Sequence, residues 1–310
     1  MVKIFQSVTE MVGNTPLVQL NNLAKKHKVK ANILGKCEFF NPAFSVKDRV
    51  ALNMLEKVPF TKITPDTVFV EATSGNTGVG LAAMCAAKGY KLVIIMPENM
   101  SVERIKLMRH YGAEVILTPK EDGMKGAVKK AQILSEKNKN VIMLKQFENP
   151  ANPQVHTLST AVELLEQTGT NIDALVCGVG TSGTITGITK ALKTCLPDLY
   201  VVAVEPKESQ VLKGQEACAH KIAGIGANFV PPFFEDNLVD EILPIASDDA
   251  INMAKEVAQT EGLGIGISAG AAVKAALEIA KRPQMMKKNI VVILPDAIER
   301  YLSLSYFDVK

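Results

Sequence analysis

The sequence contains no tryptophan, and aromatic residues make up only 5% of its 310 positions. It therefore has little material for the aromatic platforms on which proteins stack single-stranded nucleic acids. The 35 Lys and Arg residues nearly balance the 32 Asp and Glu residues, which leaves a formal net charge of +3. A dedicated nucleic-acid binder normally has a clustered basic excess. No nucleic-acid partner is predicted.

Cysteine is scarce, and its five residues are widely scattered at positions 37, 85, 177, 195 and 218. The odd count and the absence of a C-x-x-C pair argue against a disulfide framework and against a zinc site. Most of these thiols are expected to be buried as small apolar side chains. No metal ligands are predicted.

Long hydrophobic runs are also missing. The longest ones, such as LVIIM at 92–96, are far shorter than the ~18 residues of a membrane helix. The first ten residues, MVKIFQSVTE, lack the apolar region and small-residue cleavage site of a secretory signal. The expectation is a soluble, cytoplasmic protein with no membrane partner.

Apolar runs alternate with helical patterns along most of the chain, which is 47% hydrophobic. Strands that are apolar throughout and separated by helices are typical of parallel sheets covered on both faces. The predicted strands are 68–72, 91–97, 113–119, 141–147, 174–180, 200–206 and 290–296. The first predicted helix follows the strand 68–72 and ends at residue 88. The other predicted helices occupy 101–112, 123–137, 183–194 and 248–261, and one more begins at about 270. The fold class is α/β, with two domains that each contain a mostly parallel twisted sheet flanked by helices.

The division between the two α/β units is predicted near residues 149–153. The stretch 207–246 shows no clear periodicity and contains many Gly, Pro and turn residues. A segment of this length without regular structure is more often a functional loop region than a linker.

The segment GVGTSG at 178–183 fits the pattern G-x-G-x-x-G, follows a predicted strand and opens a helix. Glu205 ends the next strand, where dinucleotide-binding units carry an acidic residue. More generally, glycines let backbone N–H groups approach an anion, and a helix N-terminus favours negative charge. The sequence predicts a phosphate site here and leaves open which phosphate compound binds.

The segment GISAG at 266–270 fits the G-x-S-x-G pattern of a hydrolase nucleophile. An α/β-hydrolase needs a catalytic histidine after that serine in the chain. The four histidines, at 27, 110, 156 and 220, all precede Ser268. The sequence therefore argues against the hydrolase class.

The segment TSGNTG at 73–78 follows a predicted strand and precedes a helix. It places Thr73, Ser74, Asn76 and Thr77 at the carboxyl end of that strand, where open α/β sheets bind ligands. A capped turn accounts for one of these polar side chains and poorly for four. The segment is predicted to bind a carboxylate.

The segment NPAFSVKDR at 41–49 contains a turn followed by a helix that Ser45 can cap. Lys47 then lies in the first turn, where the positive end of the helix dipole disfavours its protonated form. A lysine of lowered proton affinity is what Schiff-base chemistry requires. The alternative is a solvated surface amine.

These four elements occur together in the cysteine synthase family. The sequence closely resembles this group of pyridoxal phosphate (PLP) enzymes of fold type II, which includes O-acetylserine sulfhydrylases and the related cystathionine β-synthases. The resemblance implies a tryptophan synthase β-like fold and covers almost the whole chain. Its motifs are GNTPLVQL (13–20), NPAFSVKDR (41–49), EATSGNTG (71–78), MPENMSVER (96–104), QFENPANPQVH (146–156), GVGTSGT (178–184), HKIAGIGA (220–227) and ERY (299–301).

The resemblance assigns roles to the residues that match these motifs. Lys47 would hold PLP as an imine and then remove the substrate's α-proton, Asn76 would bind the cofactor's ring hydroxyl, and Ser268 would meet the pyridine nitrogen. The implied phosphate-binding residues are Gly180, Thr181, Ser182, Gly183 and Thr184. The implied substrate-binding residues are Thr73, Ser74, Asn76, Thr77 and Gln146, together with Asn228.

The implied reaction is β-replacement through an aminoacrylate, in which O-acetylserine and sulfide give cysteine and acetate. No Lys or Arg occurs from 178 to 189, so backbone donors and a helix end must hold the phosphate. A serine beside the pyridine nitrogen, unlike an aspartate, does not stabilise a protonated ring. The weaker electron sink suits prompt loss of a β-substituent.

Several positions depart from the usual sulfhydrylase sequence. Ser182 and Asn228 stand where glycine is common, and Ser268–Ala269–Gly270 and Pro295–Asp296 are more similar to cystathionine synthases. The alternative activity is therefore production of hydrogen sulfide from cysteine by β-replacement or elimination, which gives serine, lanthionine or cystathionine. Asn228 would then hold water or orient a larger thiol, unless it merely lines its loop.

The sequence gives less support to two other functional classes. An NAD-dependent Rossmann oxidoreductase rests on GVGTSG and Glu205, but it leaves TSGNTG and Lys47 unexplained. A catalytically silent regulatory homologue conflicts with the intact Lys47 and TSGNTG.

The resemblance also implies partners and a domain division. The partners are amino-acid substrates (O-acetylserine, cysteine, serine), sulfide or a thiol, and a second copy of the chain in a homodimer. Residues 13–35 are expected to pack on the C-terminal domain, so the domains comprise 1–12 with 36–149, and 13–35 with 150–310.

Overall fold

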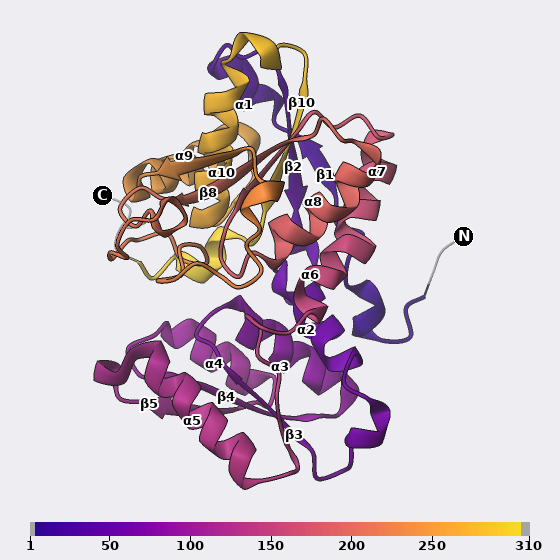
Figure 1. Cartoon of the computed structure of the whole chain (residues 1–310), viewed down its shortest axis with the longest axis vertical. Helices are drawn as coiled ribbons and strands as arrows, with labels where there is room; N and C mark the ends of the chain where they lie inside the picture. The colour runs from indigo at the N-terminus through magenta and orange to yellow at the C-terminus, as the bar shows by residue number, and fades with distance from the viewer. Residues whose placement is uncertain (1–3, 305–310) are drawn as a thin grey trace. The chain divides into compact units, whose positions relative to one another are not determined.

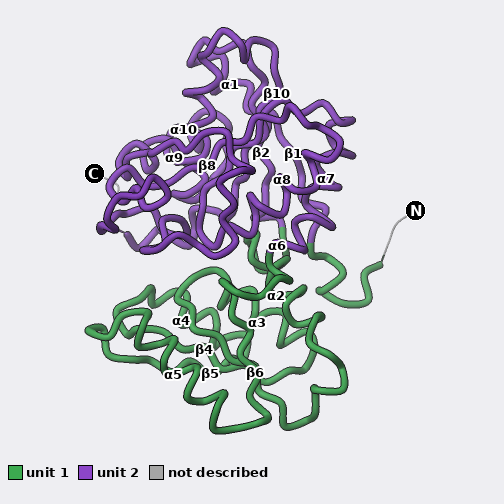
Figure 2. Tube along the Cα trace, in the orientation of Figure 1, with its two compact units in different colours: residues 1–12, 41–152 green, residues 13–40, 153–310 purple. Residues whose placement is uncertain are grey.

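The computed structural model describes residues 4–304 (Figure 1). The chain forms two compact units, one of residues 1–12 and 41–152 and one of residues 13–40 and 153–310 (Figure 2). The sequence placed these divisions after residues 12, 35 and 149. The predicted domains also include residues 1–3 and 305–310, which lie outside the described residues.

The first unit contains a four-stranded sheet with the order β5-β4-β3-β6, in which all neighbours are parallel. Parallel strands need crossover connections, and helices provide them here, as the alternating sequence pattern predicts. The strands are β3 (Val68–Ala72), β4 (Lys91–Pro97), β5 (Glu114–Thr118) and β6 (Val141–Met143). The helices are α2 (Lys47–Glu56), α3 (Asn76–Lys88), α4 (Val102–His110) and α5 (Gly123–Lys137).

Strand β6 is shorter than the predicted strand 141–147, so the second half of that prediction is wrong. The ladder ends after Leu144, whose N–H donates to the Val70 carbonyl at 3.1 Å. Lys145 then adopts a φ of 56°. This left-handed conformation turns the chain away from the sheet, and the next N–H groups bond to a buried side chain, Glu71, instead of a strand.

The second unit contains a six-stranded sheet with the order β1-β2-β10-β7-β8-β9. Strand β1 is antiparallel to β2, and the other neighbours are parallel. The strands are β1 (Leu17–Gln19), β2 (Asn32–Cys37), β7 (Ala174–Gly178), β8 (Tyr200–Pro206), β9 (Glu241–Ile245) and β10 (Asn289–Leu294). The helices are α1 (Asn21–Lys26), α7 (Ala161–Thr168), α8 (Gly183–Cys195), α9 (Ser247–Glu261) and α10 (Ile267–Ala280). The short helix α6 (Ala151–Val155) runs across the division between the units and leads into a π-helical turn, His156–Thr160.

The prediction that 207–246 is irregular holds except for β9 and two 3₁₀ turns, Val211–Lys213 and Asp236–Leu238. Pro244 within EILPI argues against a strand because proline lacks the N–H donor. Strand β9 lies at the edge of its sheet, however, and a proline is tolerated there.

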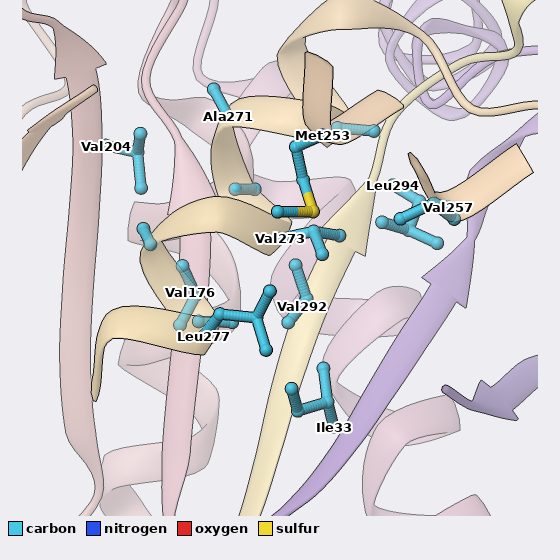
Figure 3. Close-up of a cluster of buried hydrophobic side chains, with 14 of the residues drawn as sticks. Ile33, Val176, Val204, Met253, Val257, Ala271, Val273, Leu277, Val292 and Leu294 are labelled. Carbon is cyan, nitrogen blue, oxygen red and sulfur yellow. The ribbon is translucent and has the colours of Figure 1, made fainter. Parts of the chain in front are cut away.

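Side chains of the second sheet alternate between two buried faces. Along β10, Val292 and Leu294 belong to one apolar cluster, whereas Val291 and Ile293 belong to another. The first cluster also contains Ile33, Val176, Val204, Met253, Val257, Ala271, Val273 and Leu277 (Figure 3). Burial on both faces explains why the strands read as continuous apolar runs. The predicted α/β class with two mostly parallel sheets is confirmed.

Between residues 4 and 304, no helix has both the length and the apolar character that crossing a membrane requires.

Candidate active site

Lys47 is the first residue of helix α2, so the predicted place of this lysine in a first turn is confirmed. The Ser45 hydroxyl accepts a hydrogen bond from the Lys47 backbone N–H at 3.3 Å. The buried Asp48 carboxylate accepts from the Ala43 N–H and so ties the preceding loop to the helix. The side chain of Lys47 is half-buried. Asp48 had no predicted role.

The backbone of Lys47 is also held from the side by helix α3. A Cβ atom added at Gly80 would lie 3.1 Å from the Lys47 carbonyl oxygen and 3.3 Å from the Ala51 Cβ. A larger residue would require its neighbours to shift by a few tenths of an ångström, so the start of α2 is closely packed against α3 as well as hydrogen-bonded.

The predicted carboxylate-binding segment follows β3 directly, and Asn76 begins helix α3. Thr73 is buried, and its hydroxyl accepts from the Gly75 N–H at 3.3 Å. No side chain caps α3, whose N-terminal end therefore faces the loop with the positive pole of its dipole. An anion at this loop would be stabilised by that field.

Two predicted substrate residues that are distant in sequence meet here. The Thr77 hydroxyl donates to the Gln146 Oε1 at 2.6 Å, and both side chains are buried. Because this bond engages the amide oxygen, the Gln146 NH₂ group is left to donate to an anion.

Arg104 joins this group from helix α4, although the sequence assigned it no role. Its guanidinium Nη1 donates to the Ser74 carbonyl at 3.3 Å. Ser101 caps α4, since its hydroxyl accepts from the Arg104 N–H at 3.4 Å. A cationic side chain therefore binds the backbone of the loop at Ser74.

In the second unit, the predicted phosphate turn connects β7 to helix α8. A Cβ added at Gly180 would lie 2.4 Å from the Gly224 carbonyl oxygen, so no other residue fits this backbone. The neighbouring Gly226 N–H donates to the Val179 carbonyl at 2.9 Å. The turn at 180 and the segment at 224–226 thus form one backbone cluster.

Ser182 lies at the start of α8 with a φ of 69°, the left-handed conformation that usually favours glycine. Its hydroxyl lies 3.2 Å from the Thr186 hydroxyl, which donates to the Phe233 carbonyl at 2.8 Å. The left-handed backbone explains why glycine is common at this position.

The remaining hydroxyls of the turn are supported by buried partners. Thr181 accepts from the Gly183 N–H at 3.3 Å, and Thr184 lies 3.2 Å from the His156 Nε2. The His156 Nδ1 lies 2.9 Å from the Thr160 hydroxyl. His156 is fully buried in the π-helical turn, a feature often found at functional sites. Sequence reasoning used this histidine only to exclude a hydrolase.

Ser268 occupies the first turn of α10, which begins at Ile267 and not at the predicted residue 270. The Gly266 N–H donates to the Asp296 carbonyl at 2.9 Å, and this bond fixes the start of the helix. Ser268 is buried, and its hydroxyl lies 3.8 Å from the Cβ that Gly224 would carry. The phosphate turn, Gly224 and Ser268 are therefore close together.

Asn228, unlike these buried groups, is exposed. It lies on the loop that follows Gly226. The structure brings together Thr77 with Gln146 in one unit, and the phosphate turn with Ser268 in the other.

The donor groups fit pyridoxal phosphate. A glycine turn at a helix N-terminus suits the phosphate, a buried serine hydroxyl suits a neutral pyridine nitrogen, and a half-buried lysine suits an aldehyde. Together with two parallel α/β units, these groups define a PLP-binding class of enzyme.

Residues 8–296 match the family described as "Pyridoxal-phosphate dependent enzyme". The chain belongs to this family, and the predicted cofactor and enzyme class are thereby confirmed. The chain is 48% identical over 304 residues to a cysteine synthase of Staphylococcus aureus, a match that covers 97% of this chain and 96% of that protein.

Solved structures show the same similarity. A cysteine synthase from Entamoeba histolytica superimposes with a TM-score of 0.95 at 40% identity, covering 99% of this chain and 92% of that one. A hydrogen sulfide-producing enzyme from Fusobacterium nucleatum has a TM-score of 0.92 at 43% identity, covering 96% of this chain and 100% of that one. The predicted resemblance is confirmed, and the roles of individual residues stay predictions.

Proposed function

We propose that this protein is a cysteine synthase that replaces the acetate of O-acetylserine with sulfide and releases cysteine. The observation that carries the proposal is the nearly full-length similarity to the staphylococcal cysteine synthase. The buried Thr77–Gln146 pair supports it, because an amino-acid substrate must be held by its carboxylate.

Bound PLP supplies an electron sink that lets the substrate lose its α-proton and its β-substituent. The Lys47 amine would bind the cofactor and then take up the α-proton as a general base. Lys47 is the first residue of helix α2, and the Ser45 hydroxyl accepts a hydrogen bond from its backbone N–H. Asn76 would bind the ring hydroxyl. The residues that would hold the phosphate are Gly180, Thr181, Ser182, Gly183 and Thr184.

The substrate carboxylate would bind to the loop at the start of α3. Thr73, Ser74 and Thr77 would donate hydroxyl hydrogen bonds, and the Gln146 amide would donate from the side. With the carboxylate held at several points, the substrate would present its α-proton to Lys47 in one orientation.

Ser268 would contact the pyridine nitrogen. A neutral hydroxyl would not stabilise a protonated ring as a carboxylate would, so the bound cofactor would be a weaker electron sink and would suit prompt loss of the β-substituent. This favours elimination of acetate over reactions that need a long-lived carbanion.

A second candidate is release of hydrogen sulfide from cysteine, with serine, lanthionine or cystathionine as the other product. The similarity to the hydrogen sulfide-producing Fusobacterium enzyme favours it. The exposed Asn228 would be the side chain that meets the incoming water or thiol in this reaction.

The protein is further proposed to act in the cytoplasm as a homodimer. Large apolar side chains at its surface support an interface, among them Phe40 and Leu158, which are 61% and 62% exposed.

The test is product analysis with the purified protein and added PLP. O-acetylserine with sulfide is expected to give cysteine and acetate, and Lys47→Ala should abolish this reaction. Cysteine supplied alone tests the second candidate, which requires sulfide as a product together with serine or lanthionine. Failure to form cysteine from O-acetylserine and sulfide would reject the main proposal.

A further inference from the structure

A buried acid, Glu71, links the two parts of the carboxylate-binding group in the first unit. It lies near the end of β3, two residues before the loop at 73–77, and is 2% exposed. Its Oε2 accepts from the Lys145 N–H at 2.7 Å, and its Oε1 accepts from the Gln146 N–H at 3.1 Å. Each carboxylate oxygen therefore binds one of two adjacent backbone donors.

These two bonds replace the β-ladder at the point where the chain leaves the sheet. Lys145 adopts its left-handed conformation there, and a residue in that conformation persists only when its surroundings fix it. The Gln146 carbonyl in turn accepts from the Asn152 Nδ2 at 2.8 Å. The backbone on both sides of Gln146 is thus tied down by buried side chains.

The fixed backbone determines where the Gln146 amide points. Its oxygen accepts from the Thr77 hydroxyl at 2.6 Å, and Thr77 belongs to the loop that continues from Glu71 itself. A closed path therefore runs from Glu71 through the backbone at 145–146 to the Gln146 side chain, and through Thr77 back to the same strand.

We propose that Glu71 is a positioning residue, and that its ionised carboxylate holds Gln146 in the orientation that binds the carboxylate of the amino-acid substrate. The inference rests on the proposed function of the 73–77 loop and Gln146. A protonated carboxyl has one acceptor oxygen fewer, so one buried N–H at 145–146 would lose its partner.

The ionisation of Glu71 falls within the working pH range. Burial raises the pKa of the Glu71 carboxyl to about 7, against the lowering effect of its two backbone hydrogen bonds. The charged side chain that acts on it is Glu148, whose negative charge also raises the pKa and which pairs with the Lys145 Nζ at 3.4 Å. Substrate binding should therefore weaken as the pH falls through 7.

The protonation of Glu71 affects the stability of the protein in the opposite direction from substrate binding. Because the folded protein holds this proton more tightly than the unfolded chain, the contribution of Glu71 to the free energy of unfolding decreases as the pH rises toward 7. A general loosening of the protein at low pH would weaken both properties together, whereas Glu71 moves them in opposite directions.

The experiment compares Glu71→Gln, Glu148→Gln and the unaltered protein, each loaded with PLP. Glu71→Gln should raise the KM for O-acetylserine by about tenfold while kcat stays within about threefold, the effect of one misplaced hydrogen bond. The unaltered protein should show an inflection in KM near pH 7, and Glu71→Gln should remove it. Glu148→Gln should shift that inflection to lower pH. The exposed Glu56→Gln, which breaks only a surface pair with Lys88, serves as the matched control.

A second readout does not use activity. Hydrogen exchange of the Lys145 and Gln146 amides should accelerate at least about tenfold in Glu71→Gln, because one acceptor is replaced by a donor. An unchanged KM, pH profile and amide exchange in Glu71→Gln would overturn the inference. If that variant does not fold, a KM of the unaltered protein that shows no inflection near pH 7 overturns it. Failure of the unaltered protein to react with O-acetylserine would instead reject the proposed function.

Discussion

The imidazole of His156 lies between two hydroxyl groups, with Nε2 at 3.2 Å from Thr184 and Nδ1 at 2.9 Å from Thr160. Thr184 belongs to the proposed phosphate turn, and Thr160 closes the π-helical turn that carries the histidine. A buried ring with both nitrogens engaged has one orientation, and the Thr184 hydroxyl is oriented with it.

We therefore predict that substitutions of His156 change the affinity for the cofactor phosphate. His156→Asn keeps a polar atom near the Nδ1 position but cannot reach Thr184, and should weaken PLP binding by about tenfold, the value of roughly one hydrogen bond. His156→Gln reaches further and should lose less. Titration of the apoprotein with PLP, followed by absorbance, measures both. Equal affinities for the two variants would show that the ring does not act through Thr184.

A second prediction concerns the left-handed Ser182. Ser182→Val should lower the free energy of unfolding by about 2 kcal/mol, because a β-branched residue is poorly accommodated at positive φ. Ser182→Gly should change it by less than about 1 kcal/mol, since relief of backbone strain and loss of the Thr186 contact oppose each other. Urea denaturation of the apoprotein gives both values. If Val and Gly were tolerated equally, Ser182 would not be left-handed in solution.

A third prediction concerns the buried ion pair of the second unit. The Lys36 Nζ donates to the Glu163 carboxylate at 2.6 Å, to the Thr15 carbonyl at 2.7 Å and to the Gln167 Oε1 at 2.9 Å. Lys36→Met should destabilise the protein by about 3–5 kcal/mol, because it leaves a buried carboxylate without its counter-charge. Combining it with Glu163→Gln should recover part of the loss. Additive losses in a denaturation cycle would contradict this coupling.

A fourth prediction concerns thiol reactivity. Cys37, Cys85 and Cys177 are buried, whereas Cys195 and Cys218 are exposed. Burial raises the pKa of the Cys37 and Cys85 thiols to about 12, so both stay protonated and unreactive at pH 8. A disulfide reagent should label two thiols rapidly in the native protein and the other three only after unfolding. Rapid labelling of all five would contradict the burial. Cys195→Ser and Cys218→Ser should each remove one rapid equivalent.

Much of the fold was predictable because parallel strands buried on both faces leave a continuous apolar signal. Strand boundaries were predicted wrongly where the backbone conformation depends on residues that are distant in the sequence. The end of β6 is determined by Glu71, which lies far away in sequence and whose carboxylate takes the N–H groups that a longer strand would have used. Strand β9 was not predicted because it contains Pro244. The local sequence does not reveal that β9 lies at a sheet edge, where a proline is tolerated.

The candidate site was likewise predictable only where its residues form local sequence patterns. Glycine-rich turns and clustered hydroxyls are local patterns, so the loop at 73–77 and the turn at 178–183 were recognisable. His156 contacts Thr184 of the turn, and Glu71 acts through the backbone at 145–146; such contacts form only in the folded chain. An acid inside an apolar strand was the one available signal for Glu71.

The last described strand, β10, lies in the middle of its sheet, between β2 and β7. Strands β2 and β7 both precede β10 in the sequence, so they are synthesised before the strand that pairs with them. Until Asn289–Leu294 emerge, β2 and β7 each present an unpaired edge, and the start of α10 lacks its bond to Asp296. Pairing of β10 with both neighbours therefore closes the sheet, and the segment that follows it fixes the start of the helix that carries Ser268.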